Sequence, residues 1–264
     1  MKKNRVLLVI LSLLALVALS GFGVKFYTHE KWQSQQIHIL QQQIASLKNK
    51  ETLSVEYDAE AFNYLAIGNS ITLHGKCDYW WNEIGMAASV AEKDYFHLVT
   101  DYLIAEYDKV VSYPYNFSTW EIQSTDRTQT IRSLTKYLST DLDLITIQLS
   151  ENVSNLDTFV ADYKELVTIL QKTCPSAQII LVDDFWSTEK SGLKMQIANE
   201  LGVRFASLDS IRGVNAYMCG MNATVYGDDN TAHVVEHSGV AAHPGDKGMQ
   251  AIADAIIATL KESQ

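Results

Sequence analysis

The sequence predicts an α/β fold in which a parallel, five-stranded sheet is covered by helices on both faces. Apolar runs of strand length alternate with longer helical patterns between residue 62 and the C-terminus. The strand segments are apolar at consecutive positions, as expected of strands that are buried on both faces. The connections between them are long enough for right-handed crossover helices, so we expect a three-layer α/β/α sandwich.

The expected elements follow one another in a simple order. Strands are predicted over residues 62–68, 109–115, 143–149, 178–185 and 203–208, and helices over residues 78–106, 121–139, 156–172, 188–201 and 246–262. Residues 209–243 are predicted to be irregular. Asp246 is expected to be the N-cap of the last helix, where a carboxylate accepts hydrogen bonds from free N–H groups.

The N-terminus predicts a membrane anchor. Three basic residues lie within the first five positions, and residues 6–24 carry no charge and are long enough to span a bilayer core. A secretory signal would have a shorter apolar region, and residues 18–20 match a cleavage site poorly. We therefore expect residues 1–25 to form an uncleaved, single-pass transmembrane anchor with the N-terminus in the cytoplasm and the following chain outside.

A short helical stalk is predicted over residues 26–53. This stretch is rich in Gln, and Ile37, Leu40, Ile44 and Leu47 follow the spacing of a heptad seam. The pattern covers only two heptads, so a monomeric spacer helix and a homodimeric stalk both remain open. Residues 54–264 then form one globular domain.

Composition narrows the functional class. The 264-residue chain has a formal net charge of −10 and no dense basic stripe, which argues against a nucleic-acid surface. It has no Gly-rich phosphate loop, so no nucleotide cofactor is expected. Cys77, Cys174 and Cys219 are widely spaced, which allows one disulfide at most and favours buried thiols.

One serine stands at the end of the first strand. The apolar run over residues 62–67 ends abruptly in Gly68-Asn69-Ser70, which is the place where open α/β sheets carry their chemistry. Ser70 can also be explained as a helix N-cap. Near the other end of the chain, His243 lies just before the last predicted helix. A serine hydroxyl becomes a nucleophile when such a base takes its proton.

Three blocks of the sequence resemble the SGNH (GDSL-type) hydrolases. Gly68-Asn69-Ser70-Ile71 resembles the family's first block, and His243-Pro244-Gly245-Asp246 its last. Residues 143–153 resemble the third block, a strand ending in Gly-x-Asn, with Ser150 in place of the glycine and Asn152 in place of the asparagine. The order and the separation of the blocks match, and the resemblance spans residues 60–262.

The resemblance implies a flavodoxin-like strand order and a serine-esterase mechanism. Ser70 would be the nucleophile and His243 the general base and acid. Asn152 would form the oxyanion hole together with the backbone N–H of Ser70. Asn152 can also be explained as a turn residue that ends its strand.

Two departures from the family pattern bear on activity. Residues 115–121 lack the glycine whose N–H usually joins the oxyanion hole, although a backbone N–H does not require glycine and a donor near Trp120 remains open. Val240 stands where the acid that orients the histidine usually lies. Either a carbonyl orients His243 in a Ser-His dyad, or another carboxylate does, and Glu236 is the nearest candidate upstream. Without an orienting acid, a catalytically silent protein is an alternative.

Residues 233–237 spell H-x-x-E-H, a zinc-peptidase signature. That chemistry requires both histidines on one helical face. The surrounding residues are β-branched and interrupted by glycine, which disfavours a helix. We therefore expect no metal site, and place His233 and His237 at the rim of the active site.

The sequence thus predicts a membrane-anchored, extracytoplasmic carbohydrate esterase of SGNH type. It would remove acetyl or other short acyl esters from cell-surface glycans, without a cofactor. Asn69, Trp80, Trp81 and Glu151 are predicted to contact the substrate. A glycan O-acyltransferase that uses the same acyl-enzyme remains an alternative, as does a silent module that binds glycans through Tyr79 and the two tryptophans.

Overall fold

The structure is a computed structural model that describes residues 55–123 and 127–262. The predicted anchor and stalk lie outside these residues and stay predictions. Within the described ranges, no helix is both long enough and apolar enough to cross a bilayer.

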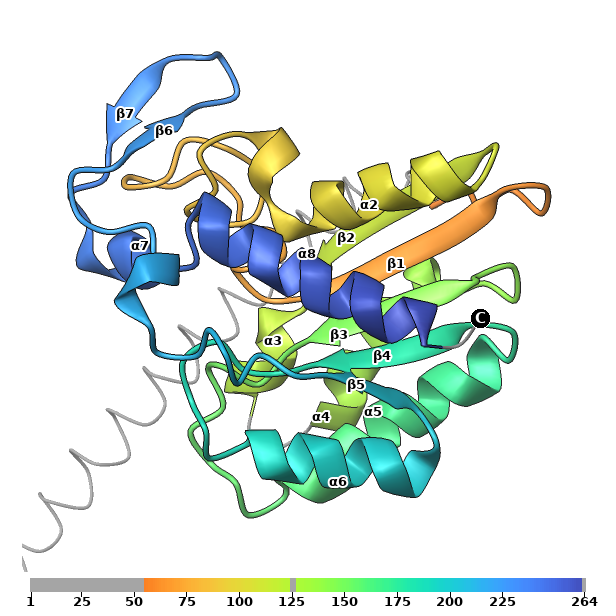
Figure 1. The fold of residues 1–264 in the computed structure, drawn as a ribbon. Helices are drawn as coiled ribbons and strands as arrows, with labels where there is room; N and C mark the ends of the chain where they lie inside the picture. The colour runs from red at the N-terminus through yellow and green to blue at the C-terminus, as the bar shows by residue number, and fades with distance from the viewer. Residues whose placement is uncertain (1–54, 124–126, 263–264) are drawn as a thin grey trace, which may run out of the picture. The chain divides into compact units, whose positions relative to one another are not determined.

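Five parallel strands form one sheet in the order β2-β1-β3-β4-β5 (Figure 1). The strands are β1 (Phe62–Gly68), β2 (Val110–Asn116), β3 (Leu144–Gln148), β4 (Gln178–Val182) and β5 (Arg204–Ala206). This is the flavodoxin-like order, so the expected sheet is confirmed. Gly68 pairs in register with both Asn116 and Gln148, which brings the carboxyl ends of β1, β2 and β3 to one edge.

Helices cover both faces of the sheet (Figure 1). One face carries α2 (Tyr95–Glu106) and α8 (Asp246–Lys261), and the other carries α3 (Ser118–Ile122), α4 (Arg127–Ile131), α5 (Phe159–Thr173) and α6 (Ser191–Leu201). Alternate side chains of β1 enter different cores: Tyr64 and Ala66 pack with α2 and α8, whereas Leu65 and Ile67 pack with α5 and α6. The predicted three layers are confirmed, because the central strand is apolar on both sides.

Two expected helices differ from the structure. The helix predicted over residues 78–106 begins only at Tyr95, after an irregular stretch and the 3-10 turn η1 (Ala91–Lys93). Gly85 lies so close to the turn after β1 that a Cβ there would be 2.5 Å from the carbonyl oxygen of Ile71. The helix predicted over residues 121–139 is divided into α3, α4 and the 3-10 helix η2 (Arg132–Tyr137).

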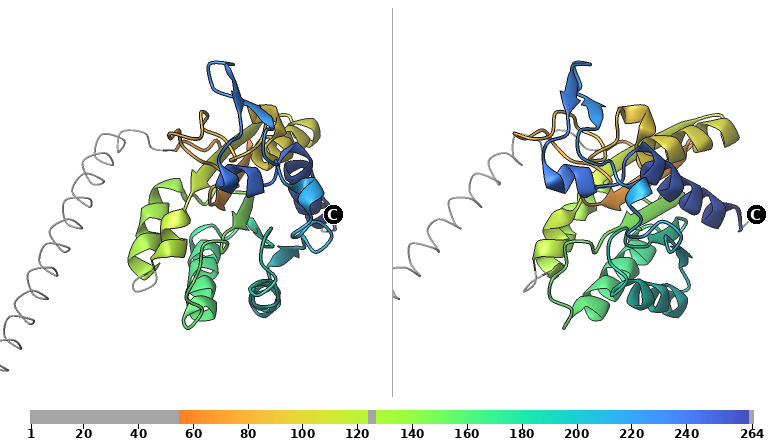
Figure 2. Two further views of the ribbon diagram at one scale, coloured as in Figure 1. Left: turned by 90° about the vertical axis from the view of Figure 1, so that its left-hand side faces the viewer. Right: turned by 60° about the vertical axis from the view of Figure 1, so that its left-hand side comes forward.

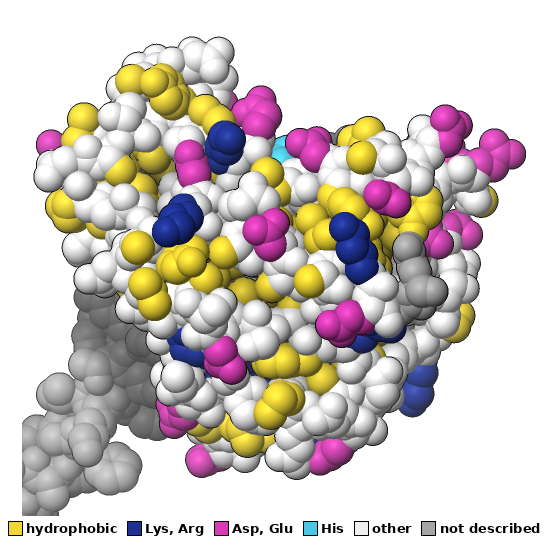
Figure 3. Space-filling view, viewed as in Figure 1, with side chains coloured by type: hydrophobic (Ala, Val, Ile, Leu, Met, Phe, Trp, Pro, Cys, Tyr) yellow, Lys and Arg dark blue, Asp and Glu magenta, His cyan; other side chains and the backbone are white. Residues whose placement is uncertain are grey.

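The stretch predicted to be irregular contains short elements. These are η3 (Asn215–Tyr217), the hairpin of β6 (Thr224–Tyr226) and β7 (Ala232–Val234), and α7 (Ser238–Ala242). The hairpin stands away from the main sheet (Figure 2). On the face that carries α8, acidic and basic side chains are interspersed with small hydrophobic patches, as on a solvent-facing surface (Figure 3).

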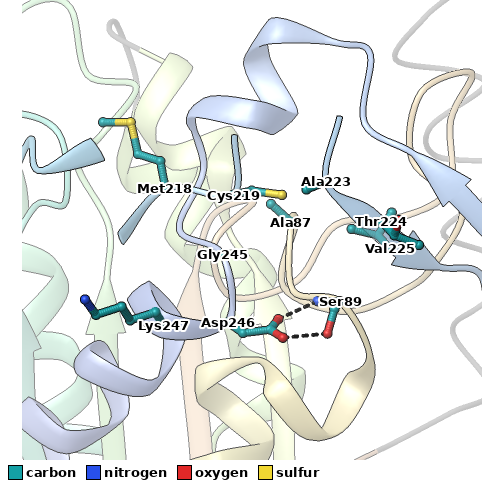
Figure 4. Close-up of a pocket in the computed structure, with 10 residues that line it drawn as sticks. All are labelled: Ala87, Ser89, Met218, Cys219, Ala223, Thr224, Val225, Gly245, Asp246 and Lys247. Atoms are coloured by element: carbon teal, nitrogen blue, oxygen red, sulfur yellow. Dashed lines mark hydrogen bonds between the residues drawn. The ribbon is translucent and has the colours of Figure 1, made fainter. Parts of the chain in front are cut away.

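Asp246 is not the N-cap of α8. Gly245 holds that position, and Asp246 is the first helical residue. Its carboxylate accepts hydrogen bonds from the N–H and the hydroxyl of Ser89, at 2.7 and 2.6 Å (Figure 4). Asp246 therefore ties the start of α8 to the loop before α2. All three cysteines are free, and the expected burial holds for Cys174 alone.

Candidate active site

Local backbone contacts place Ser70 at the carboxyl end of the central strand. β1 ends at Gly68, and the side-chain oxygen of Asn69 accepts a hydrogen bond from the N–H of Ile71 at 3.0 Å, which forms a tight turn. A Cβ on Gly68 would lie 1.7 Å from the hydroxyl oxygen of Thr72, so only glycine lets the turn close. Ser70 projects from this turn.

The turn brings Ser70 into contact with His243. The hydroxyl oxygen of Ser70 lies 2.8 Å from Nε2 of His243, although the two residues are 173 positions apart. Nδ1 of the same ring lies 2.7 Å from the carbonyl oxygen of Gly239. A carbonyl can only accept, so Nδ1 carries the proton and Nε2 is left to accept the proton of the serine. The pair has the geometry of a nucleophile and its base.

The group that orients the histidine is a backbone carbonyl. Of the two alternatives that the sequence left open, the structure shows the Ser-His dyad held by Gly239. Glu236 is exposed and has no contact with the ring, so the upstream carboxylate is not the partner. Val240 is buried in the core that α2 and α8 share. The short helix α7 thus offers a carbonyl where the family resemblance places an acid.

The environment keeps His243 neutral. Burial lowers the pKa of the ring to about 4, and the neighbouring His74 and His237 lower it further, while the Gly239 carbonyl acts in the opposite direction. The ring is therefore an unprotonated base at neutral pH. Among residues 55–123 and 127–262, no carboxylate contacts Nδ1 to stabilise the imidazolium that forms when the ring takes a proton.

The two groups predicted to donate to an oxyanion each keep an N–H group available. In the described part of the chain, the N–H of Ser70 has no protein acceptor, which leaves it free for a ligand. Asn152 lies on the loop after β3, where its side-chain Nδ2 donates to Oε2 of Glu121 at 2.6 Å. A carboxamide nitrogen has two N–H groups, so one remains to donate to a ligand. The role of Asn152 as an oxyanion donor stays a prediction.

Ser150 has a backbone conformation that glycine adopts readily. Its φ is 121°, which explains why the resembling block carries glycine at this position. The Ser150 hydroxyl donates to the buried carboxylate of Asp184. Asp184 also accepts from Nζ of Lys194 at 2.9 Å, and Nζ of Lys190 lies 3.7 Å away. A buried cluster of Asp184 and two lysines therefore stabilises the strained turn at Ser150.

Two of the four residues predicted to contact the substrate are buried. The side chain of Trp80 is 0% exposed and belongs to the core, because the loop after Ser70 folds it inward. Asn69 is also 0% exposed, with its amide on Glu121 and on the Ile71 N–H. Both side chains are enclosed by protein, and their contact with substrate stays a prediction.

Glu151 and Trp81, the other two residues predicted to contact the substrate, differ in their surroundings. The Glu151 carboxylate accepts the backbone N–H of Phe185, and that of Trp186 at 3.5 Å, so it supports the loop after β4. Burial and the charge of Asp184 raise the pKa of Glu151 to about 8. Trp81 is partly exposed, and its contact with substrate stays a prediction.

The sequence did not point to two residues of the site. Trp186 packs edge-on against His243, with ring centroids 4.8 Å apart, and its Nε1 donates to the carbonyl oxygen of Ala242 at 2.8 Å. Glu121 is 2% exposed and contacts both Asn69 and Asn152. The one available signal was position, since Trp186 and Glu121 follow strands β4 and β2 at the active edge.

The two histidines of the H-x-x-E-H stretch stack on aromatic rings. His233 lies on β7 and stacks on Trp81, with ring centroids 4.1 Å apart and planes 3° apart. His237 stacks on Tyr79 at 4.0 Å and 9°. The stretch is not helical, so the two rings do not share a helical face. Among the described residues, no group of three or more His, Cys, Asp or Glu side chains could hold a metal ion.

A pocket lies at the start of α8, and neither residue of the dyad lines it. Its lining includes Ser89, Cys219, Gly245, Asp246 and Lys247 (Figure 4). Neither Ser70 nor His243 lines it, so it is not the cleft in which an ester would meet the dyad.

Comparison with known proteins identifies the fold. No protein-family model and no curated protein sequence matches this chain. Among solved structures, a two-domain esterase active on acetylated mannans matches with a TM-score of 0.50 and 16% identity, over 77% of this chain and 50% of that one. The fold is that of the SGNH-type hydrolases. This chain spans half the length of that two-domain esterase.

Further solved structures match this chain with lower TM-scores. An acetyl xylan esterase from Geobacillus stearothermophilus matches with a TM-score of 0.47 and 16% identity, over 77% of this chain and 97% of that one. A phospholipase A1 from Streptomyces albidoflavus matches with a TM-score of 0.49 and 11% identity, over 75% and 99%. The activity of this chain therefore has to be argued from the residues of its own site.

Proposed function

We propose that this protein is a serine esterase of SGNH type that removes acetyl or other short acyl groups from glycans. The observation that carries the proposal is the 2.8 Å contact between the Ser70 hydroxyl and Nε2 of His243, at the active edge of an SGNH-type sheet. The fold neighbours are esterases and lipases, which supports an ester-bond hydrolase.

The dyad can carry out both halves of ester hydrolysis. Ser70 attacks the ester carbonyl carbon while Nε2 of His243 takes the hydroxyl proton. The resulting oxyanion accepts hydrogen bonds from the Ser70 N–H and from Asn152. The carbon–oxygen bond to the leaving alcohol then breaks, and His243 returns the proton to that alcohol. Water attacks the acyl-serine in the same way, which releases the acid and restores Ser70.

The surroundings of the dyad favour a sugar ester. Trp81 and Tyr79 hold flat, partly exposed rings against His233 and His237, and such surfaces suit the apolar faces of sugar rings. His237 is near enough to His243 to lower its pKa, so this rim adjoins the dyad. The structural neighbour active on acetylated mannans supports the same substrate class.

We further propose that the domain works outside the cytoplasm on a membrane anchor. The support is in the sequence: residues 6–24 are uncharged, and the basic residues precede them. A dimer through residues 26–53 remains part of this proposal. A protease-protection assay on intact cells tests the location of the domain, because a domain outside the cell is digested and a cytoplasmic one is protected.

Activity assays with the full-length chain test the esterase. Wild type should release acetate from an activated acetyl ester and from an acetylated glycan, and Ser70→Ala should lower kcat by about 10³-fold or more. Transfer of the acetyl group to an added sugar would identify the acyltransferase instead. Glycan binding by a wild type that hydrolyses no ester would identify the silent module.

A further inference from the structure

We propose that Glu121 is a positioning residue that holds the oxyanion-hole amide of Asn152 in its working orientation. The inference rests on the proposed esterase function. Glu121 itself faces inward at 2% exposure and does not reach a ligand. It would act on the reaction through Asn152 and through the turn that carries Ser70.

The carboxylate of Glu121 joins three loops of the active edge. Its Oε1 accepts the Asn69 side-chain N–H at 3.0 Å and the Ser150 backbone N–H at 2.6 Å. Its Oε2 accepts the Asn152 side-chain N–H at 2.6 Å. These partners follow β1 and β3, and Glu121 follows β2. One side chain thus connects the residue before the nucleophile to the loop that carries the oxyanion donor.

The chemistry of these contacts requires a carboxylate. All three partners are N–H donors, and an ionised carboxylate is purely an acceptor. In the described part of the chain, no Lys, Arg or His forms an ion pair with Glu121, so the three N–H groups are what compensates the burial of this side chain. A purely stabilising role could be filled by apolar packing, whereas orientation of two amides needs an acceptor at a fixed point.

Glu121 lies in the segment that departs from the family pattern. The resemblance leads us to expect a glycine N–H donor within residues 115–121, and this chain has no glycine there. Glu121 ends the same segment, on the short helix α3. A backbone N–H does not require glycine, so another residue of this segment can still supply that donor. The side-chain amide of Asn152 has to be held in place by its contacts, and its contact here is with Glu121.

Glu121→Gln tests the proposal selectively. A glutamine that keeps its oxygen at the Oε1 position still accepts from Asn69 and Ser150, but its Nε2 then faces the Asn152 Nδ2 donor. The variant therefore releases Asn152 and leaves the other two contacts in place. Glu106→Gln, at the exposed end of α2, makes the same chemical change away from the site and serves as the matched control.

A double-mutant cycle on the full-length protein separates positioning from general support. Asn152→Ala should lower kcat by about 10²-fold to 10³-fold, as loss of one oxyanion donor does. Glu121→Gln should lower kcat by at least about 10-fold, with KM within about 3-fold. If Glu121 acts through Asn152, the double variant should fall no further than Asn152→Ala alone.

Two kinetic results would overturn the proposal. Multiplicative losses in the double variant would show that Glu121 acts independently of Asn152. A rise in kcat in Glu121→Gln would show that its negative charge near the oxyanion matters more than the orientation it imposes. In either case the esterase function would stand.

Side-chain amide NMR on 15N-asparagine-labelled protein gives a readout that does not depend on activity. The Asn152 amide protons should exchange slowly with solvent in wild type and in Glu106→Gln, and at least about 10-fold faster in Glu121→Gln. If wild type hydrolyses no ester but this difference appears, the proposed function fails and the positioning role of Glu121 holds. Unchanged exchange of the Asn152 amide would overturn the inference whatever the activity.

Discussion

The pH dependence of hydrolysis should reveal the carbonyl-held histidine. Burial and two neighbouring histidines place the pKa of His243 at about 4, against an ordinary value of 6.5. Since the neutral ring is the base, kcat/KM should stay flat from about pH 8 down to about pH 5 and then fall with one proton. An esterase whose histidine is paired with a carboxylate would lose activity at a higher pH.

The same shift has a consequence for stability, and its sign can be worked out. The unfolded ring binds a proton below its ordinary pKa of 6.5, whereas the folded ring does so only below about 4. Between these values the unfolded state holds more protons, so the free energy of unfolding falls as the pH falls through that window. A difference of 6.5 − 4 = 2.5 units corresponds to about 3 kcal/mol.

Initial rates and urea unfolding at each pH measure the two effects. Circular dichroism should show a folded protein at every pH used for rates, and activity should return in full on neutralisation. Ser70→Ala gives the background rate. An apparent pKa of 6.5 or higher in kcat/KM, with the protein folded, would refute the environment described for His243.

Three further predictions concern single side chains. Val240→Asp introduces a carboxylate where the family resemblance places one. Because this side chain packs in the core, we expect the variant to lose about 3 kcal/mol or more in unfolding free energy and to gain nothing in kcat. A stable variant with a higher kcat, measured by urea unfolding and rate assays, would contradict this. Ser150→Ala should be less stable than Ser150→Gly by about 1 kcal/mol. Both variants lose the hydrogen bond to Asp184, but only alanine is strained at a φ of 121°. Equal urea midpoints for the two variants would be evidence against this strain. Trp80→Ala should destabilise the fold by about 3 kcal/mol or more. Trp81→Ala should instead raise KM for a glycan ester and leave hydrolysis of a small acetyl ester unchanged. An increase in KM for both esters would argue against a sugar-binding role of the Trp81 ring.

The sheet could be predicted from the sequence because its strands are apolar on both sides. β1 has the predicted bounds, since the run over residues 62–68 is buried at nearly every position. The loop after it has aromatic residues as dense as those of a buried helix, so its sequence predicts a helix that the structure does not contain before Tyr95. Trp80 and Gly85 instead pack an irregular segment against the nucleophile turn, which depends on contacts with Ile71 that no local pattern reveals.

The dyad could also be predicted, but its support could not. Ser70 and His243 each lie at a recognisable break between a regular element and a loop. The contact of His243 with the Gly239 carbonyl could not be predicted from the sequence, because every residue has a backbone carbonyl. Glu121 looks like an ordinary surface acid of a short helix, and its role appears only when the ends of β1, β2 and β3 come into register.

Reaction with a fluorophosphonate tests the central claim most directly. The full-length protein should gain one phosphonyl group, and peptide mass spectrometry should place it on Ser70. His243→Ala should slow this labelling by about 10³-fold or more, because the hydroxyl then has no base. Labelling at another residue, or labelling of Ser70 at an equal rate in His243→Ala, would contradict a nucleophile activated by this histidine.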